Sequence, residues 1–488
     1  MRPECDRVRV VSRVFVVCLC LPWACASPEP AGSDDPSYRW GRLLSGPTEE
    51  NEIDAVASDA EGNVFVAGKF EEILTIAGAA ERLVSAGRAD IMLAEYDREG
   101  ALRWVRQYGG ASEDNVFDAD CDAEGNVYLS GYFGGTVAFG DHELTTTGLR
   151  DLDAMVVKVD PMGEVLWARS FGSSAAVDGG NELTVAPSGA VHVLVDSADP
   201  TWDGAARWSL LDDPTGAATP IGDPVEGGRD GFLLVLDPDD GAVRWSAQVG
   251  GAGAVRMKSL AVDAEGTVYA GGDLDGANVI AGETLATFGG RDGFLASWTG
   301  AGELRWHHTL GGPGDDLCKG LAIAPGGAYA VGSFESTARF GADSLAADGT
   351  DMFVWRLAAD GTTEWLQALT SSAPLTGAEV VTAPGGGVIF GFRMYAETEL
   401  GSATGAVPVA LPEPGTSWPL LVAYEPGGTV GWTLLPERST DANLDEISRS
   451  GSRIYVDLPI FAGSYTIGAD VLENPTGTKD AVIAAIDL

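Results

Sequence analysis

Aspartates and tryptophans that fall between repeated segments are the side chains of this sequence best suited to binding chemistry. Neighbouring carboxylates can bind cations or hydrogen-bond donors, and tryptophans in polar, Gly- and Pro-rich stretches commonly stack on sugars or anchor protein partners. We take the following as ligand-binding candidates: Asp114, Asp178, Asp315, Asp316, Trp202, Trp208 and Trp418. Trp418 stands where the other repeats carry an aspartate, so it departs from the repeated pattern.

No motif for a catalytic centre accompanies these candidates. The sequence lacks a G-x-S-x-G nucleophile turn, an H-E-x-x-H metal motif and a phosphate-binding glycine loop. We therefore predict no catalytic residues and a non-enzymatic protein. Scattered carboxylates can also form the site of a glycan lyase or hydrolase, so an enzyme of that class is the alternative hypothesis.

The sequence gives little support for a metal or another cofactor. Turns of the form Asp-Ala-Glu-Gly begin at Asp59, Asp122 and Asp263, but they lack the ligand ladder of a calcium loop. Aspartate favours such turns because it hydrogen-bonds its own backbone. His307 and His308 are adjacent, so on a strand they point to opposite faces and do not share a metal. We predict no cofactor, with calcium as the open alternative.

The elements that position the candidates are repeats marked by tryptophan. The markers recur at intervals of 59 to 78 residues, at Trp40, Trp104, Trp167, Trp245, Trp306, Trp365 and Trp432. A glycine turn follows each one after about 20 residues, and an aspartate such as Asp153 usually precedes it by 14 or 15 residues. Because several markers keep one phase, the repeats are copies of one structural unit.

Each repeat predicts four β-strands and no helix. Short apolar runs rich in β-branched and aromatic residues alternate with turn residues, as in 116–121, 126–133, 154–160 and 164–171. A four-stranded repeat made about seven times is typical of a β-propeller, whose ring hides sheet edges. The regular tryptophans on the fourth strand predict packing between neighbouring blades.

The two ends of the chain predict how the ring closes. Tyr38 to Leu44 is a tryptophan strand with no preceding partner, and Asp480 to Leu488 is a third strand with no fourth. We therefore predict an all-β fold over residues 38–488, a seven-bladed β-propeller with four-stranded antiparallel blades. The N-terminal tryptophan strand completes the last blade.

The repeat resembles a bacterial family of seven-bladed β-propeller repeats, often called SBBP. The shared pattern is G-x-x-D-x-F-V-x-x-x-D-x-x-G-x-x-x-W-x-x-x-x-G-G, followed by D-x-x-G-N-V-Y-x-x-G, and it is clearest in 87–109, 148–171 and 290–312. The resemblance implies the fold and export, and it carries no catalytic residues. The Asp-x-x-Gly…Trp spacing is also similar to the tryptophan-docking motifs of quinoprotein dehydrogenases, where the motif is structural.

Two insertions between the second and third strands predict the location of a binding site. They span Asp196 to Gly228, which contains Trp202 and Trp208, and Ala396 to Ser417. In a propeller with this strand order, these connections share one face with those between repeats, where Asp114, Asp178, Asp315 and Asp316 lie. Function on a rigid scaffold usually sits on such loops, so we expect ligands at this face.

The N-terminus predicts export. Four arginines precede an apolar run from Val14 to Leu21, and Ala24-Cys25-Ala26 fits a signal-peptidase site, so residues 1–26 form a signal peptide. Cys25 is a lipidation candidate, which leaves free secretion and a lipid anchor at the bacterial cell envelope as alternatives. Residues 27–37 form a polar linker. No later stretch is long and apolar enough for a transmembrane segment.

The amino-acid composition limits the classes of partner that the chain is expected to bind. The formal net charge is −42 over 488 residues, and so strong an excess of acid disfavours nucleic acid and anionic membranes. We predict an exported monomer that recognises a protein or a polysaccharide through the loop face described above. A purely structural protein of the envelope is a further alternative.

Overall fold

The computed structural model describes the chain from the first predicted strand to the C-terminus with several gaps. The described residues are 36–48, 51–146, 152–172, 177–198, 208–210, 219–222, 229–413, 415–435, 446–458, 463–467, 470–474 and 480–488. They form 38 β-strands and no helix, and nearly all strand pairs are antiparallel. The all-β prediction is therefore confirmed. The predicted signal peptide, Cys25 and almost all of the linker lie outside the described residues.

Twenty-eight of the strands pair into groups of four. The first three groups are β2 (Ala55–Ser58), β3 (Val64–Ile76), β4 (Leu83–Tyr96), β5 (Leu102–Gly110); β6 (Asn115–Cys121), β7 (Val127–Gly134), β10 (Leu152–Val159), β11 (Val165–Gly172); and β12 (Val177–Val185), β13 (Val191–Ala198), β16 (Arg229–Leu236), β17 (Val243–Gly251).

Three further groups follow along the chain, and a last one combines both ends. They are β18 (Val255–Val262), β19 (Val268–Leu274), β22 (Asp292–Trp298), β23 (Leu304–Gly311); β24 (Leu317–Ala324), β25 (Gly327–Phe340), β26 (Asp343–Ala358), β27 (Thr363–Ser371); β28 (Thr376–Thr382), β29 (Val388–Met394), β32 (Trp418–Tyr424), β33 (Val430–Leu434); and β34 (Ile447–Ser450), β35 (Arg453–Asp457), β38 (Ala481–Asp487), β1 (Ser37–Ser45).

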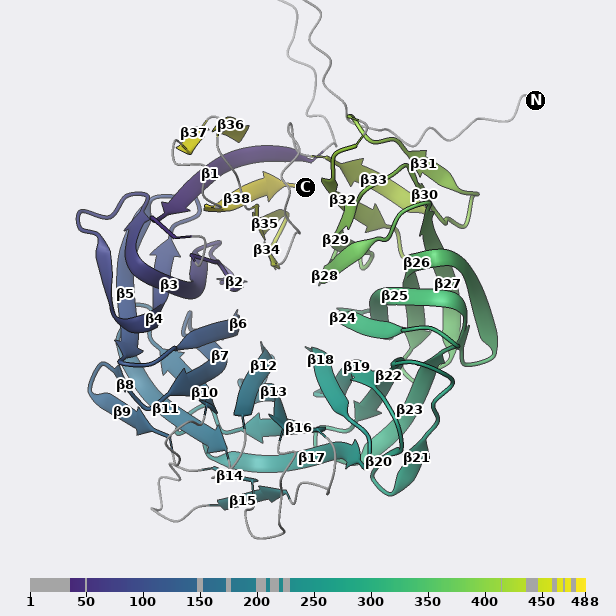
Figure 1. Cartoon of the computed structure of the whole chain (residues 1–488), viewed down its shortest axis with the longest axis horizontal. Helices are drawn as coiled ribbons and strands as arrows, with labels where there is room; N and C mark the ends of the chain where they lie inside the picture. Colours follow the sequence, from purple (N-terminus) through teal and green to yellow (C-terminus); the bar gives the residue numbers. More distant parts are fainter. Residues whose placement is uncertain are drawn as a thin grey trace, which may run out of the picture.

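The groups follow one another around a common centre, as in a propeller. In Figure 1 the first strand of each group, from β2 through β6, β12, β18, β24 and β28 to β34, lies innermost, and the fourth strand lies toward the outside. The third strands are almost entirely buried, as in β10 and β22, because sheets on both sides cover them. Burial on both faces explains why the sequences of these third strands are largely apolar.

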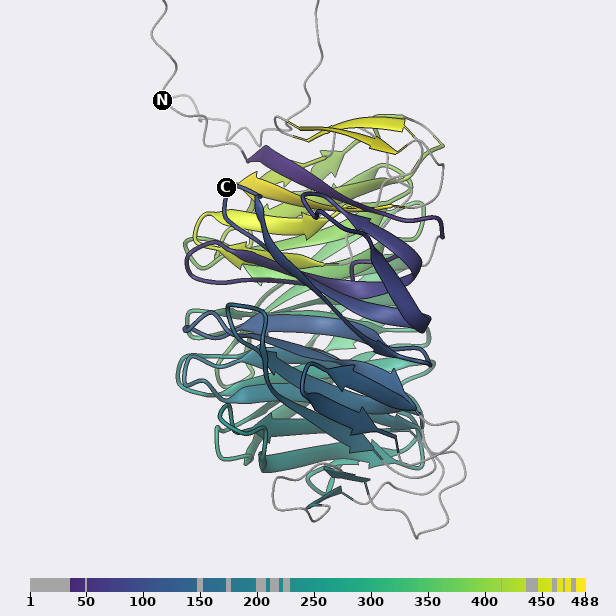
Figure 2. The same cartoon turned by 90° about the vertical axis from the view of Figure 1, so that its left-hand side faces the viewer.

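The N-terminal and C-terminal strands lie side by side. β1 pairs antiparallel with β38 from Ser37 opposite Asp487 to Leu44 opposite Ala481, as predicted for these segments. Arg39 and Arg453 both contact the Asp487 carboxylate, the latter at 2.6 Å. In Figure 2 the purple first strand and the yellow last strand run together along one side of the molecule.

Tryptophans of the outer strands join consecutive groups. In six cases the indole N–H donates to a backbone carbonyl of the turn that precedes the outer strand of the next group. The pairs, at 2.8–3.1 Å, are Trp40–Arg98, Trp104–Pro161, Trp167–Pro238, Trp245–Gly300, Trp306–Ala359 and Trp365–Pro426. The ring also rests on a turn glycine: a Cβ at Gly302 would lie 2.9 Å from Trp245. The tryptophan and the glycine of the repeat therefore meet across a seam.

The predicted burial of all seven tryptophans is only partly correct. Trp40 and Trp167 are buried, with 5% and 3% of their surface exposed, whereas the other five are half-buried. The outer strand lies at the rim, where one part of the ring stays in contact with water while the N–H is satisfied by the next turn. The contact between groups is present, but complete burial is not.

Hairpins between the second and third strands lie along outer strands. Four cover the outer edge of the preceding group, and the hairpin of the last group lies against β1 of its own group. These hairpins are β8 (Thr136–Phe139) with β9 (His142–Thr145), β14 (Trp208–Leu210) with β15 (Thr219–Gly222), β20 (Asn278–Ile280) with β21 (Glu283–Leu285), β30 (Thr398–Leu400) with β31 (Val407–Val409), and β36 (Gly463–Ile467) with β37 (Asp470–Asn474). Strands β8, β14, β20 and β30 pair with β5, β11, β17 and β27, respectively. The long outer ends of β3 and β25 pair in the same way with β1 and β23.

This arrangement changes the interpretation of the two insertions. The connection through Ala396 to Ser417 contains β30 and β31, and the fourth and fifth groups carry equivalent pairings in β20 and β25. Outer strands would otherwise leave backbone N–H and C=O groups unpaired at an exposed edge. The hairpin is therefore a repeated structural element, and its presence alone does not indicate a ligand.

Deletion of residues 37–45 should destabilise the protein strongly. The deletion removes β1 and leaves the edge of β38, which is buried along almost its whole length, without a partner. Exposed apolar strand edges promote aggregation, so we expect a lower melting temperature and soluble aggregates in light scattering. Unchanged melting of a monomeric truncated protein would contradict this role of β1.

Replacement of Trp167 by alanine should cost about 3–5 kcal/mol of unfolding free energy, as large-to-small changes in a core do. Trp167 packs on Tyr128 with ring centres 6.0 Å apart and donates to Pro238. Denaturant unfolding measures the change. The neighbouring Leu166, which is 47% exposed, supplies the control, because Leu166→Ala should change stability by about 0.5 kcal/mol or less. Equal effects of the two substitutions would disprove the seam role of Trp167.

Candidate functional site

Bulges in the innermost strands place side chains around the centre of the ring. The pairing of β6 with β7 skips Phe117, that of β18 with β19 skips Lys258, and that of β24 with β25 skips Lys319. A bulge of one residue re-aims the side chain of the strand that carries it. The three residues thus occupy corresponding positions near the start of three innermost strands, close to the connections between groups.

Glycines opposite the bulges make this geometry fit. A Cβ at Gly131 would lie 2.0 Å from the carbonyl oxygen of Asn115, and one at Gly272 would lie 2.0 Å from that of Arg256. No side chain fits at such distances, so these positions require glycine. The last glycine of the Val-Tyr-x-x-Gly segment of the repeat therefore serves the bulge, and through it the orientation of the central side chains.

The bulge residues combine an aromatic ring with two ammonium groups. Phe117 is 37% exposed and packs against Tyr132, with ring centres 5.3 Å apart. Lys258 is exposed and Lys319 is half-buried. Within the described part of the chain, neither lysine forms an ion pair within 4 Å. Burial, and then the nearby charge of Arg291, lowers the pKa of Lys319.

A network of ion pairs lies beside the two lysines. Arg256 contacts Asp273 at 2.9 Å, and Arg291 contacts Asp315 at 2.8 Å and Asp273 at 3.9 Å. The backbone N–H and the guanidinium of Arg291 hold the pKa of Asp315 below its usual range. Asp315 is therefore already engaged by an arginine of its own surroundings.

Carboxylates occupy the position that follows the bulge. Asp118 is paired with Ser130 and Glu379 with Gly391, and Glu182 and Glu446 stand at the same offset, four residues before the first turn of their groups. Burial raises the pKa of Glu446 well above its usual value, and the charges of Glu379, Asp118 and Glu182 raise it further. The acids of several groups thus interact across the centre.

These acids also join innermost strands to one another. Asp118 accepts hydrogen bonds from the backbone N–H of Leu183 on β12 at 2.6 Å and from that of Ala119. Asp120 accepts from the N–H of Val185 on β12 at 2.8 Å and from the Thr184 hydroxyl. Adjacent groups are not paired as sheets here, so the carboxylates satisfy backbone donors that face the seam. Sequence reasoning missed them, although their fixed offset from the turn was a usable signal.

Two aspartates that the sequence singled out are structural. Asp114 and Asp316 are fully buried. Asp114 accepts from the N–H groups of Gly110 and Gly134, at 2.8 and 3.2 Å, and Asp316 accepts from those of Gly312 and Glu335, at 2.7 and 3.0 Å. They hold the connection between groups against the second strand, so their carboxylates are already used in the scaffold, and ligand binding by them stays a prediction. Burial raises the pKa of each to about 6.

The tryptophan candidates divide into one correction and two open cases. Trp418 is 4% exposed, packs in the core of the sixth group and donates to the Thr416 hydroxyl at 2.8 Å, so it does not offer its ring to a ligand. Trp202 lies outside the described residues. Only the backbone of Trp208, in β14, and of Asp178, in β12, is described, so their proposed contacts remain predictions.

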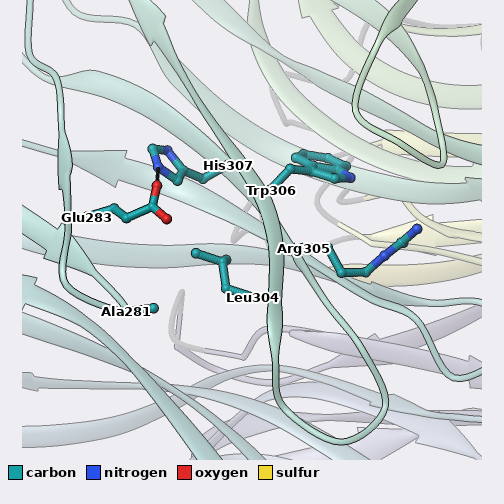
Figure 3. Close-up of a pocket in the computed structure, with 6 residues that line it drawn as sticks. All are labelled: Ala281, Glu283, Leu304, Arg305, Trp306 and His307. Atoms are coloured by element: carbon teal, nitrogen blue, oxygen red, sulfur yellow. Dashed lines mark hydrogen bonds and ion pairs between the residues drawn. The ribbon is translucent and has the colours of Figure 1, made fainter.

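A second candidate site is a groove at the outer rim. It has a volume of about 530 Å³ and is lined by Ala281, Glu283, Leu304, Arg305, Trp306 and His307. Figure 3 shows the Glu283 carboxylate facing the His307 imidazole, at 3.1 Å, while Arg305 and Trp306 extend to the other side of the strand. His308 instead contacts the rings of Trp306 and Trp355, which confirms that the two histidines do not point to one place.

The described residues contain neither a metal cluster nor a helix that could cross a membrane. No group of three or more His, Cys, Asp or Glu side chains among them has the arrangement of a metal site. The described part also has no membrane-spanning helix. The candidate sites among the described residues therefore consist of charged and aromatic groups on a β-scaffold.

The pH dependence of stability should reflect the central acids. Burial raises the pKa values of Asp118, Glu182 and Glu446, so their protonated forms are favoured in the folded state. Stability from such groups is present at low pH and is lost as pH rises through the folded-state pKa. The raised pKa values of Asp114 and Asp316, about 6 each, act in the same direction. We therefore expect the melting temperature to rise on acidification from about pH 7 to about pH 5, the range in which Asp114 and Asp316 titrate.

Glu182→Gln/Glu446→Gln should raise melting at neutral pH and flatten this profile, because it removes two mutually repelling charges. The control is Glu265→Gln/Glu303→Gln, which removes two exposed acids. Thermal scans across the pH range distinguish central from general charge effects. The same dependence of melting temperature on pH in both double variants would contradict the prediction.

The comparisons with known proteins find similarity of structure only. No family model matches the chain, and no curated protein matches it. Among solved structures, the chain is similar to the quinohemoprotein alcohol dehydrogenase ADHIIG from Pseudomonas putida HK5, at 10% identity and a TM-score of 0.40, covering 93% of this chain and 76% of that one.

Two other solved structures have comparable likeness. The microbial sialidase Hz136 has 10% identity and a TM-score of 0.35, with 93% of this chain and 94% of that chain covered. XC5397 from Xanthomonas campestris, described as a gluconolactonase, has 11% identity and a TM-score of 0.29, with 94% and 99% covered. At these identities and scores, the likeness assigns neither an activity nor a ligand to this chain.

Proposed function

We propose that the chain is an exported, non-enzymatic β-propeller of seven blades that binds an acidic polysaccharide near the centre of the ring. Export would place it free or lipid-anchored, through Cys25, at a bacterial cell envelope, as the N-terminal sequence predicts. The repeat pattern supports a relationship to the SBBP proteins.

The blade number rests on the strand groups. Six groups follow one another along the chain, and the seventh takes β34, β35 and β38 from the C-terminal end and β1 from the N-terminal end. A ring joined in this way leaves no group with a free seam. The indole contacts between successive groups support the same arrangement.

The observation that carries the binding proposal is the pair of lysines at the bulges. In a chain of net charge −42, Lys258 and Lys319 stand on neighbouring innermost strands without ion pairs in the described residues. An ammonium group without a direct ion pair attracts anions, and the local field is strengthened where protein walls exclude water. The charge of Lys258 also acts on the carboxyl groups of Glu182 and Asp196. Phe117 and Tyr132 offer aromatic surface at the corresponding position of another group. Carboxylate or sulfate groups on a polysaccharide suit this combination.

The alternative is a glycan lyase or hydrolase that uses the central acids. Burial keeps Asp118, Glu182 and Glu446 protonated at higher pH than usual, as a general acid requires. Asp118 already accepts two backbone hydrogen bonds, however, and the neighbouring Asp120 has the same role. Structural use of these carboxylates supports binding over catalysis.

The double variant Lys258→Ala/Lys319→Ala should lose at least about tenfold in affinity for acidic polysaccharides, since two charged contacts disappear. The mature protein would be tested on a glycan array with uronic-acid, sulfated and neutral polysaccharides, followed by titration at two salt concentrations. Binding should weaken with salt. Arg82→Ala is the control, because Arg82 is an exposed cation in the turn between β3 and β4.

Several results would reject the proposal. Equal affinity of the double variant and the wild type for the polysaccharide would show that the two lysines do not contact it. Binding of neutral polysaccharides alone would show that charge is not recognised. Capture of an acidic protein in place of any polysaccharide would favour a protein ligand. Depolymerisation of a bound glycan, lost in Glu182→Gln, would favour the enzyme.

A further inference from the structure

In one outer strand, the position that follows the repeat tryptophan holds a different kind of residue from the other outer strands. The residue after each repeat tryptophan is apolar or small in the other described outer strands, namely Gly41, Val105, Ala168, Ser246, Leu366 and Thr433. Ala168 is buried in the seam with the preceding group, and Leu366 packs against a seam core. In β23 the same position is His307. Blade packing does not require an imidazole here.

His307 is held by a carboxylate from the neighbouring sheet. Its Nε2 lies 3.1 Å from Glu283 of β21, and β20 of the same hairpin pairs with β17 of the preceding group. The contact therefore spans two groups. The carboxylate accepts the Nε2 proton, which leaves Nδ1 as a hydrogen-bond acceptor. Within the described residues, Nδ1 is buried and has no hydrogen-bond partner.

The contact between Glu283 and His307 lies at the wall of a groove. Nδ1 of His307 is buried, so a ligand in the groove would meet the Glu283 carboxylate, whose side chain is 68% exposed. The adjacent groove of about 530 Å³ falls within the usual range for small-molecule sites. Its wall offers a carboxylate acceptor at Glu283 and apolar surface at Leu304, whereas the Arg305 side chain extends to the other side of the strand (Figure 3).

We propose that this groove, between the β20–β21 hairpin and β23, binds one sugar unit. A sugar presents several hydroxyl groups on an apolar ring, so it can donate to the exposed Glu283 carboxylate, which His307 holds in place, and lay its C–H surface on Leu304. The inference rests on the proposed polysaccharide binding, because it supplies a second contact for the same class of ligand. This contact lies at the outer strand β23 of the group whose innermost strand, β18, carries Lys258. The groove would thus recognise a single unit while the centre recognises charge.

A panel of methyl glycosides of neutral hexoses tests the groove, with binding to the mature protein followed by calorimetry and ligand-observed NMR. We expect millimolar or tighter binding of at least one glycoside. His307→Leu should weaken it at least about tenfold, because the imidazole no longer holds the Glu283 carboxylate in place. The melting temperature should stay the same or rise, because leucine occupies the equivalent position at Leu366.

Glu283→Gln provides a second variant, which should not disturb folding because 68% of the Glu283 side chain is exposed. It should also weaken glycoside binding, and Arg82→Ala should not. Absence of glycoside binding by the wild type, or unchanged binding in both variants, would overturn the proposal. Retention on acidic polysaccharide is recorded in parallel with the lysine double variant, so failure of the central site appears in that assay and failure of the groove appears in the glycoside assay.

Discussion

The hydrogen bond between an indole N–H and the backbone carbonyl of the next group is the interaction on which the ring depends. Sheets pair strands within a group but not along the inner seams, so another contact must fix the angle between groups. The indole is rigid, and its nitrogen lies 2.8–3.1 Å from the carbonyl oxygen that it donates to. This contact leaves little freedom in the angle between two groups. The same ring rests on a turn glycine, which sets the distance of approach. Repetition of this contact transmits one geometry around the molecule.

Acids make further contacts at the seams, beside the apolar cores there. Asp114 and Asp316 anchor the connections between groups, and Asp118 and Asp120 bind backbone donors of β12. These four carboxylates therefore have structural roles. Acids placed at corresponding positions of several innermost strands repel one another, and this cost is lowest when some of them are protonated.

Both proposed binding regions lie where the repeat changes. The bulge position is filled by different residue types in different groups, with Phe117, Lys258 and Lys319 among them. The position after the tryptophan is apolar or small except at His307. A repeat must conserve the turns, glycines and tryptophans that propagate it, but it leaves these positions free. The scaffold thus holds variable side chains on invariant geometry, which is how repeat folds acquire binding sites.

The amino-acid sequence alone determined the all-β class, the phase of the repeat and the partner strands at the two ends, because strand periodicity, turn glycines and spacing are local properties. It did not determine how the strands project their side chains. The tertiary structure decided that Asp114, Asp316 and Trp418 are internal, since burial depends on what packs above them. It also brought Glu283 to His307 and aligned acids from separate groups. Residues about 60 positions apart meet across a seam only after the ring forms, so no local pattern records those contacts.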